Sequence, residues 1–455
     1  MPGPGRSSNG RTTALRERTK RLAILEGMMW AAQNGVGAYF ITPFALMVGA
    51  SDFAIGLLRA FSTLSSAIGY YAGAWLLQFE KGRRELISKF TTIQAFSWLL
   101  LAILPLLPTD RAVLLVLFYS LMSFVGSMIS PAWTSMMSDV VVGKERGEYF
   151  GRRSKISGFV EFAMSILTGA FLSWMTGNLL LGFGITFFLA FLFRYISSQL
   201  LKRHWDPPFK PDHESFISVV KPPNDPYLKN LIYLSAGMVF ATGIAGPFFA
   251  VFMLRDLHFS YIDFAIATAA STFATLISQP YWGKVIDKYG TRPVMFATAL
   301  LIPFIAILWI PADSFAYVIL IQLYSGVVWA GFDLANFNML LKISPRKTLH
   351  DYAAHMNGLG ALTTFFGSIA GSFLALFLEG STIGLLNSIQ TIFLISAVAR
   401  FVVAALTVPR ITKTMTVDGP RFLIRVITVY PMKGVMAELT EFQNTFASLT
   451  NYHHR

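Results

Sequence analysis

Three carboxylic acids inside long apolar stretches are the residues of this chain best suited to chemistry: Glu26, Glu161 and Asp333. An ionisable side chain is costly in a hydrocarbon environment, so such residues usually face water, a partner or a ligand. Glu26 and Glu161 lie about one to two helical turns from the ends of their stretches. Each therefore either reaches interfacial water or a basic loop, or contributes to proton transfer or ligand binding.

Asp333 lies about nine residues from one end of its stretch and about eighteen from the other, too deep for its side chain to reach either surface. Trp329 and Asn336 share its helical face, because the three positions are spaced at i, i+4 and i+7. Two interpretations stay open. Asp333 is either a proton-coupling or solute-binding residue in an aqueous cavity, or a buried aspartate bonded only to neighbouring helices.

Other apolar stretches also carry polar faces at helical spacing. Such a face either holds helices together or lines a water-filled path. Arg59 shares a face with Thr63, Ser66 and Tyr70, and is either an anion contact or outer-gate residue, or a side chain that snorkels to headgroups. The remaining faces are Glu26, Trp30, Gln33 and Gly37, with Asn34 beside them; Ser123, Ser127, Ser130 and Thr134; and Thr268, Thr272, Thr275 and Gln279.

Enzyme chemistry is not indicated. The chain has no HExxH motif, no Ser-His-acid constellation, no aspartate-rich metal motif and no cysteine. We therefore expect no catalytic residues, no metal site and no cofactor. A P-loop for ATP is also absent from the sequence.

Twelve apolar segments must position these residues, and each is long enough for a hydrocarbon core of about 30 Å. If each segment crosses a bilayer, 32 of the 37 Lys and Arg residues fall on one side, which places both termini in the cytoplasm. The predicted spans are 22–49, 53–78, 90–107, 112–138, 156–177, 179–201, 230–253, 261–283, 294–311, 315–341, 353–378 and 383–408.

The composition agrees with a multi-pass membrane protein. The mean hydropathy is +0.55, 54% of residues are hydrophobic and only 13% are charged, which does not suit a soluble domain. The net charge of +13 is explained by cytoplasmic loops near anionic headgroups, so we expect no nucleic-acid partner. The lipid bilayer is the expected partner.

The chain also repeats itself at a period slightly above two hundred residues. Asp52-Phe53-Ala54-Ile55 recurs as Asp263-Phe264-Ala265-Ile266, and Arg194 answers Arg400. A duplicated unit with an even number of spans gives two parallel repeats. The predicted organisation is a basic cytoplasmic tail over 1–21, a six-helix half over 22–201, an extended cytoplasmic linker over 202–229, a second six-helix half over 230–408, and a cytoplasmic tail over 409–455 whose RFLIRVITVY stretch fits an amphipathic helix.

Residues 283–292, GKVIDKYGTR, resemble the cytoplasmic GxxxDxxGxR signature of the major facilitator superfamily. Twelve spans in two parallel halves joined by a cytoplasmic linker match that family too. The KERGEYFGRR loop after the fourth span is similar to a poorly characterised prokaryotic branch of it. The first half departs from the signature, with Trp75 and Phe79 at the glycine and aspartate positions.

The resemblance implies an all-α transporter with two six-helix repeats, and a cytoplasmic gate formed by Gly283, Asp287, Gly290, Arg292 and Arg146. Gly283 would permit close helix approach, and Asp287 would cap a helix or pair with a basic loop residue. The polar faces are mostly neutral, amide and aromatic, which suits an uncharged or weakly cationic solute.

Three functional hypotheses stay open. The first is a secondary transporter that moves a small organic solute by alternating access, as a symporter or antiporter if Asp333 couples transport to protons. The second is a passive uniporter or lipid scramblase, and the third is a non-transporting membrane sensor. We expect a monomer in the cell membrane.

Overall fold

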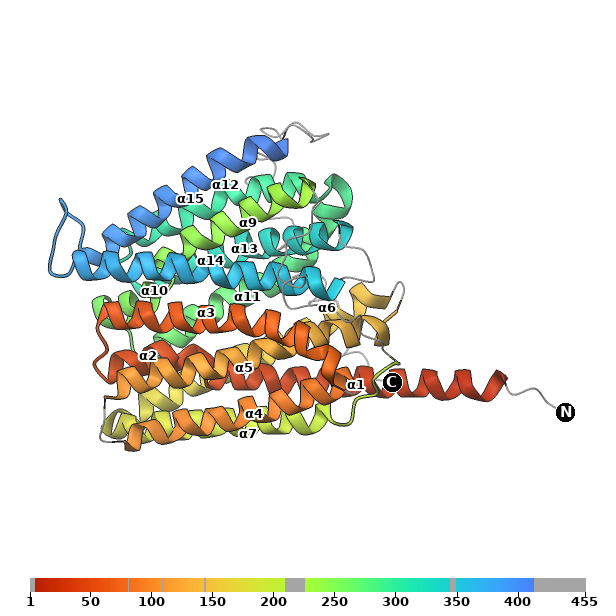
Figure 1. The fold of residues 1–455 in the computed structure, drawn as a ribbon. Helices are drawn as coiled ribbons and strands as arrows, with labels where there is room; N and C mark the ends of the chain where they lie inside the picture. Colours follow the sequence, from red (N-terminus) through yellow and green to blue (C-terminus); the bar gives the residue numbers. More distant parts are fainter. Residues whose placement is uncertain are drawn as a thin grey trace, which may run out of the picture. The chain divides into compact units, whose positions relative to one another are not determined.

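The computed structural model describes residues 5–80, 82–107, 110–142, 145–208, 226–343 and 349–412. These residues are almost entirely helical (Figure 1). Within these ranges the β pairing consists of a single bridge between Ile383 and Leu386. The predicted all-α fold is confirmed.

The helices follow the predicted spans closely. In the first half they are α1 (Gly5–Val36), η1 (Ala38–Phe40), α2 (Ile41–Met47), α3 (Asp52–Leu76), η2 (Leu77–Phe79), α4 (Arg83–Ile103), η3 (Leu104–Leu106), α5 (Arg111–Val140), α6 (Glu145–Trp174), η4 (Thr176–Asn178) and α7 (Leu179–Leu201). In the second half they are α9 (Pro226–Ala245), α10 (Phe248–Val251), the π-helical η5 (Phe252–Asp256), α11 (Tyr261–Tyr289), α12 (Thr291–Trp309), α13 (Phe315–Ile343), α14 (Leu349–Phe377) and α15 (Ser388–Thr412).

Local capping explains where several helices begin. Ser51, Asp110 and Asn178 each accept a hydrogen bond from a backbone N–H in the first turn of α3, α5 and α7. Before α11, the backbone N–H of Ser260 and its hydroxyl both donate to the Asp263 carboxylate, and the Asp263 N–H donates back to the Ser260 hydroxyl. Polar residues that stop the apolar runs therefore also satisfy the free N–H groups at the helix starts.

Eleven helices in the described ranges are long and apolar enough to cross a membrane. The predicted first span is the additional one, and it is built differently, since the chain leaves the α-helix at Gly37 and continues through η1 and α2. Its seventh-span counterpart is broken as well, between α9 and α10 at Gly246 and Pro247. Proline lacks an N–H for the helical ladder, which accounts for the second break.

Three predicted boundaries need correction. The helix of the first span begins at Gly5, so the predicted tail over 1–21 is largely helical. The last span begins at Ser388 rather than 383, because residues 381–387 form a turn with Gly384 at φ +63°. The first residues of the predicted linker are not extended, since Trp205 packs against the buried residues at the inner ends of α3, α4 and α5. Residues 209–225 and 413–455, with the predicted amphipathic helix, lie outside the described ranges.

The chain forms two compact units. Unit 1 comprises Met1–Asp225, Val239–Ala269 and Ser344–Ile392, and unit 2 comprises Pro226–Met238, Ala270–Ile343 and Phe393–Arg455. In unit 1, α3 packs between α5 and α14, α4 packs on α5 and α7, and α1 packs on α6 and α7. In unit 2, α12 packs on α13, and the Trp282 indole donates to the Val327 carbonyl at 2.8 Å to join α11 to α13.

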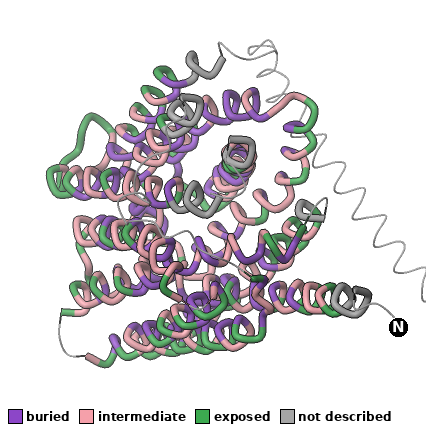
Figure 2. The backbone as a smooth tube through the Cα atoms, turned by 45° about the vertical axis from the view of Figure 1, so that its right-hand side comes forward, coloured by how far each residue is buried: buried purple, intermediate pink, exposed green. Residues whose placement is uncertain are grey.

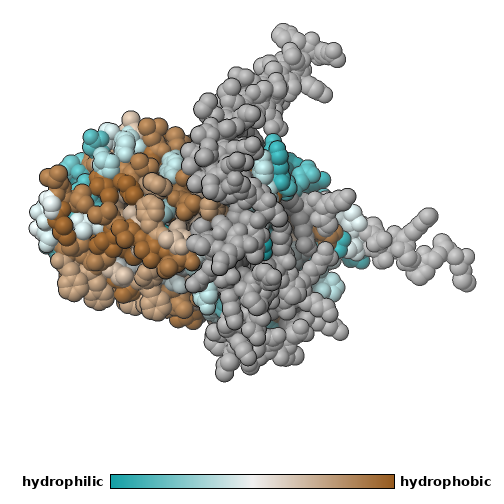
Figure 3. Space-filling view, turned by 90° about the horizontal axis from the view of Figure 1, so that it is seen from above, coloured by the Kyte–Doolittle hydropathy of each residue, from teal (hydrophilic) through white to brown (hydrophobic). Residues whose placement is uncertain are grey.

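Small residues allow these close crossings. At Gly73 of α3, an added Cβ atom would collide with the backbone of Met128 on α5. Interfaces of this kind are typical of membrane helices, where close backbone approach replaces the hydrophobic effect as a source of stability. Most helices carry buried, intermediate and exposed positions along their length (Figure 2), whereas α12 is largely buried. Apolar side chains cover most of the described surface seen in Figure 3, as expected for helices that face lipid.

Candidate functional site

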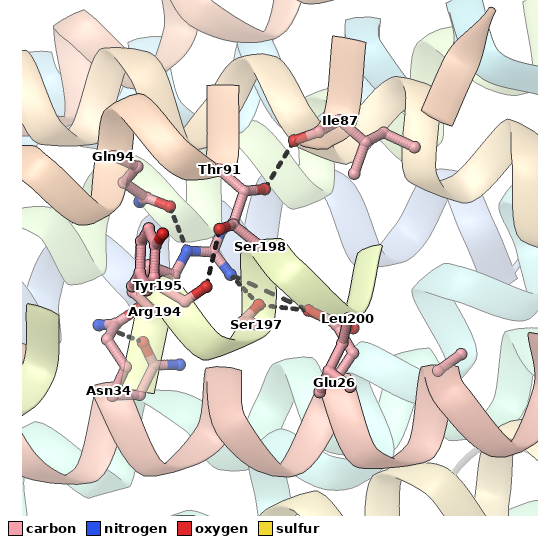
Figure 4. Close-up of polar contacts among 12 residues, drawn as sticks. Glu26, Asn34, Ile87, Thr91, Gln94, Arg194, Tyr195, Ser197, Ser198 and Leu200 are labelled. Atoms are coloured by element: carbon pink, nitrogen blue, oxygen red, sulfur yellow. Dashed lines mark hydrogen bonds and ion pairs between the residues drawn. The ribbon is translucent and has the colours of Figure 1, made fainter. Parts of the chain in front are cut away.

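Glu26 of α1 lies in a buried ion-pair cluster within unit 1 (Figure 4). Its Oε1 accepts a hydrogen bond from Ser197 Oγ at 3.0 Å, and its Oε2 accepts one from Arg153 Nη2 at 3.1 Å. Arg194 Nη1 lies 4.0 Å from Oε1, and Arg194 Nε donates to Gln94 Oε1 at 2.7 Å. Four helices, α1, α4, α6 and α7, therefore meet around one carboxylate.

Arg153 is fixed on its other sides as well. Its Nε donates to the Ala23 carbonyl at 3.0 Å, and its guanidinium lies 4.5 Å from the centre of the Trp133 ring. A buried ion is tolerated when its charge is paired and its hydrogen-bonding groups are satisfied. Glu26 meets both conditions, so the geometry favours a structural role for it, joining the helices of the first half.

The other candidates on α1 and α6 are less enclosed. Glu161 is half-buried on α6 and accepts a hydrogen bond from the Tyr39 hydroxyl in η1. Gln33 is buried and donates to Asn34 Oδ1 at 3.2 Å, whereas Trp30 is exposed. Glu161 and Glu26 thus lie in separate surroundings, and no hydrogen bond or ion pair joins them in the described part of the chain.

A continuous polar face runs along α3 in unit 1. Arg59 is exposed at its outer part, and Thr63, Ser66 and Tyr70 follow along the same side. The charge of Arg59 interacts with Tyr119 of α5. Arg59 therefore lies beside α5, on the side of α3 that carries the polar residues.

Residues of α5 extend this face. Tyr70 of α3 shares a hydrogen bond with Ser127 of α5, and the Ser123 hydroxyl donates to the Tyr119 carbonyl at 2.8 Å. Part of the predicted serine stripe therefore bonds within and between helices, as membrane-helix hydroxyls often do. The same holds for Thr275 in unit 2, whose hydroxyl donates to the Gly326 carbonyl of α13 at 3.1 Å.

Unit 2 presents a second polar face on α13. Asp333 is exposed, and no described residue donates a hydrogen bond to its carboxylate or forms an ion pair with it. Asn336 Oδ1 accepts a hydrogen bond from Ser235 of α9 at 2.9 Å, and the Trp329 ring packs edge-on against Phe332 at 5.7 Å. The amide and the indole are thus held in place beside a carboxylate that has free hydrogen-bonding capacity.

The comparisons with known proteins agree with this architecture. Residues 231–426 match the model of the Major Facilitator Superfamily. A crystal structure of a mutant of the nucleoside transporter NupG aligns with a TM-score of 0.61 at 14% identity, covering 86% of this chain and 98% of that one. A second crystal structure of NupG gives a TM-score of 0.59, again at 14% identity, with coverage of 88% and 99%. No curated protein matches the chain.

The second half of the chain thus matches the major facilitator superfamily, and most of the chain shares the fold of the NupG structures. The family match and the long apolar helices indicate a multi-pass membrane protein that is a transporter rather than an enzyme. Within the described ranges, no group of three or more His, Asp or Glu residues is placed to hold a metal ion.

The family signature lies at the junction of α11 and α12. Gly290 adopts φ +88° directly before α12, a conformation that side-chain-bearing residues rarely adopt, so this position requires glycine for the turn. Asp287 is exposed and has no hydrogen-bond or ion-pair partner among the described residues. The close helix approach expected at Gly283 is not seen in the described part of the chain, where nothing lies within 4 Å of an added Cβ atom. The side chain of Arg146 is outside the described residues.

A second ion-pair cluster, which the sequence did not predict, lies near the start of α4 and the ends of α5 and α7. Arg83 is fully buried, and it pairs with Asp139 at 2.6 Å and with Asp206 at 3.1 Å. Asp139 ends α5, and Asp206 lies just after α7. The GRR sequence of residues 82–84 marked the loop as basic but gave no sign that Arg83 is the enclosed residue.

The segment after α7 is anchored by this cluster. Arg83 Nη2 donates to the Pro207 carbonyl at 3.1 Å, and the Trp205 N–H donates to Thr19 Oγ1 of α1 at 2.9 Å. His204 is buried, and burial lowers its pKa below the usual value while its Nδ1 lies 2.9 Å from the Leu200 carbonyl oxygen. Residues 204–207 are therefore held against the helices of the first half.

Proposed function

We propose that this protein moves a small organic solute by alternating access and couples that movement to protons through Asp333. The observation that carries the proposal is the exposed Asp333 carboxylate, well inside α13 and without a hydrogen-bond or ion-pair partner in the described part of the chain. A charged side chain facing hydrocarbon is strongly disfavoured, so this carboxylate needs an aqueous surface or a proton.

A coupling residue must bind a proton in one state of the transport cycle and release it in another. An acid on the wall of a cavity does this when closure removes water from it, because desolvation favours the neutral form. Asp333 has no fixed cation to hold it in the charged form in the described residues, in contrast to Glu26. This difference supports Asp333 over Glu26 as the proton carrier, with Glu161 as the next candidate.

The neighbours of Asp333 supply the contacts that a solute would use. Trp329 offers an aromatic face, and Asn336 offers an amide that is already oriented by Ser235. A ring-containing solute with hydrogen-bonding groups fits such a pair. Nucleosides have this chemistry, and the structurally similar NupG is named a nucleoside transporter, so nucleosides belong in the first set of candidates.

The test has two steps. A thermal-shift screen of purified protein against sugars, amino acids, nucleosides, organic anions, lipids and cationic drugs identifies a solute, since a ligand that binds the folded state stabilises it. Proteoliposomes then measure accumulation of that solute under a pH gradient. If one proton moves per solute, one pH unit drives about tenfold accumulation.

We expect Asp333→Asn to abolish gradient-driven accumulation while exchange at equal pH stays measurable. Asp313→Asn is the matched control, because Asp313 is an exposed residue outside the helices between α12 and α13. Accumulation that persists in Asp333→Asn would refute this residue as the carrier. Flux that ignores the gradient in the unmodified protein would indicate a uniporter or scramblase, and binding without flux would indicate a sensor.

The cellular setting completes the proposal. The charge distribution along the sequence supports cytoplasmic termini and insertion in the cell membrane. We propose that a monomer is the functional unit.

A further inference from the structure

Arg59 is the one exposed arginine among those inside the predicted spans, which are Arg59, Arg194 and Arg400. Arg153 and Arg194 are paired with Glu26, Arg255 is paired with Asp52 and Asp256, and Arg400 is buried. No described residue accepts a hydrogen bond from the Arg59 guanidinium or forms an ion pair with it. Its five N–H donors are therefore available.

The helix α3 shows which way Arg59 faces. Successive residues of an α-helix turn by about 100°, so positions 59, 63, 66 and 70 share one side while Phe61 and Ile68 lie about 180° away. Phe61 and Ile68 are 41% and 51% exposed, as expected for side chains in contact with lipid. Between these two faces, Leu58 and Gly69 on one flank and Ala60 and Ala67 on the other are buried.

Arg59 consequently points away from the lipid-facing side of its helix. In the described residues no hydrogen bond or ion pair joins Arg59 to Asp52 near the start of α3, and Asp52 is bonded to Arg255 at 2.7 Å. Arg59 interacts electrostatically with Tyr119, a residue at a similar distance from the start of α5. A charged group on an interior face without an internal counter-ion needs water or an external anion.

We propose that Arg59, with the hydroxyl group of Tyr119, forms a subsite for an oxyanion group of the transported solute, either a carboxylate or a phosphate. This inference rests on the proposed transport function and narrows its substrate class. Guanidinium binds such groups through two parallel hydrogen bonds. The expectation of an uncharged or weakly cationic solute rested on Asp333 as the one deep charge. The positive charge of Arg59 favours instead a solute that carries an oxyanion group.

A lipid phosphate has the same chemistry, so the test must separate the two sources. The chain has no cysteine, which allows a single thiol to report on this position. In the purified protein, Thr63→Cys places a thiol about 6 Å from Arg59 along the helix. Its reaction rates with a negatively and a positively charged thiosulfonate reagent of similar size are then compared.

We expect both reagents to react, with a preference for the negative one that falls by about tenfold or more when Arg59→Gln is added, as Coulomb attraction at this separation predicts. Arg59→Lys should retain the preference, because it keeps the charge. Ile68→Cys on the opposite face should react with neither reagent. A thiol at position 63 that does not react, or a preference unchanged by Arg59→Gln, overturns the subsite.

Two further arms assign the anion. The preference of the thiol for the negative reagent should be the same in a phosphate-free detergent and in phosphatidylcholine nanodiscs. If the preference is lost in the nanodiscs alone, a lipid phosphate occupies Arg59. Leucine and leucinamide, benzoate and benzamide, and uridine monophosphate and uridine are then compared as protectants of the thiol. We expect protection by the member that carries the carboxylate or phosphate in at least one pair, and not by its twin without that group; equal effects within every pair overturn the substrate class. These measurements require no transport of solute. The subsite can therefore be disproved without disproving the transport proposal, and the reverse also holds.

Discussion

At the scale of single residues, the depth of a charge in its span predicted its importance but not its partner. Glu26 lies near the start of its predicted span and Arg194 near the end of its span, at similar depths. This similar depth is the one feature of the sequence that agrees with their contact in the structure. The contact between Glu26 and Ser197 could not be predicted from the sequence, because the two residues are 171 positions apart. Arg83 was missed for the same reason, since Asp139 and Asp206 are 56 and 123 positions away.

Glu26 offers a direct measure of this buried cluster. Replacing one member of a buried ion pair leaves the other charge uncompensated, which typically costs about 3–5 kcal/mol. We expect Glu26→Gln to lower the free energy of unfolding by that amount, seen as a clear drop in the apparent Tm of detergent-purified protein.

Glu80→Gln is the control for this prediction. Glu80 pairs with Lys89 at 3.0 Å, but the Lys89 side chain is 59% exposed. Exposed pairs contribute up to about 1 kcal/mol, so the Tm should move little. Equal losses in the two variants would show that the Glu26 cluster has no special role in stability.

At the scale of helices, periodicity and length predicted the spans well, and the breaks within them poorly. The sixth helix runs over Leu179–Leu201, as predicted, because Asn178 stops the apolar run and caps the helix. The interruption at Gly37 and the π-helical segment Phe252–Asp256 gave no periodic sign in the sequence. Such breaks depend on neighbouring helices, which hydropathy alone does not identify.

The α3–α5 crossing can be tested with one methyl group. Gly73→Ala should destabilise the protein by about 1–3 kcal/mol, because the added Cβ meets the backbone of Met128 and backbone cannot rotate away. The apparent Tm of the purified protein is the measurement.

Gly151→Ala is the matched control for helix propensity. Gly151 lies inside α6, is exposed, and has no described atom within 4 Å of an added Cβ. Alanine there should raise stability by about 0.5–1 kcal/mol. A Gly73→Ala variant as stable as Gly151→Ala would mean that the two helices do not approach as closely as described.

At the scale of the whole molecule, the distribution of basic residues predicts the orientation in the membrane. The loops after even-numbered spans and the two tails hold 32 of the 37 Lys and Arg residues. Anionic headgroups and the positive-inside tendency both favour the cytoplasmic side for those loops.

Single cysteines in this cysteine-free chain test that orientation. We expect Thr176→Cys, between α6 and α7, to be labelled by an impermeant maleimide added to intact cells. Lys202→Cys, directly after α7, should be labelled only after the membrane is permeabilised. The reverse pattern would invert the topology and place the termini outside.

The packing of α14 on α3 means that an early helix must wait during synthesis for its partner. Gly56 of α3 lies against Ser372, and Tyr71 lies against His355, so one flank of an early helix is completed by a late one. With α3 ending at Leu76 and α14 at Phe377, a ribosome that adds about 5–20 residues per second takes roughly 15–60 s to deliver the partner. During this interval the flank must be covered by lipid or by an insertion factor, and chains released before residue 349 never acquire their final neighbour there.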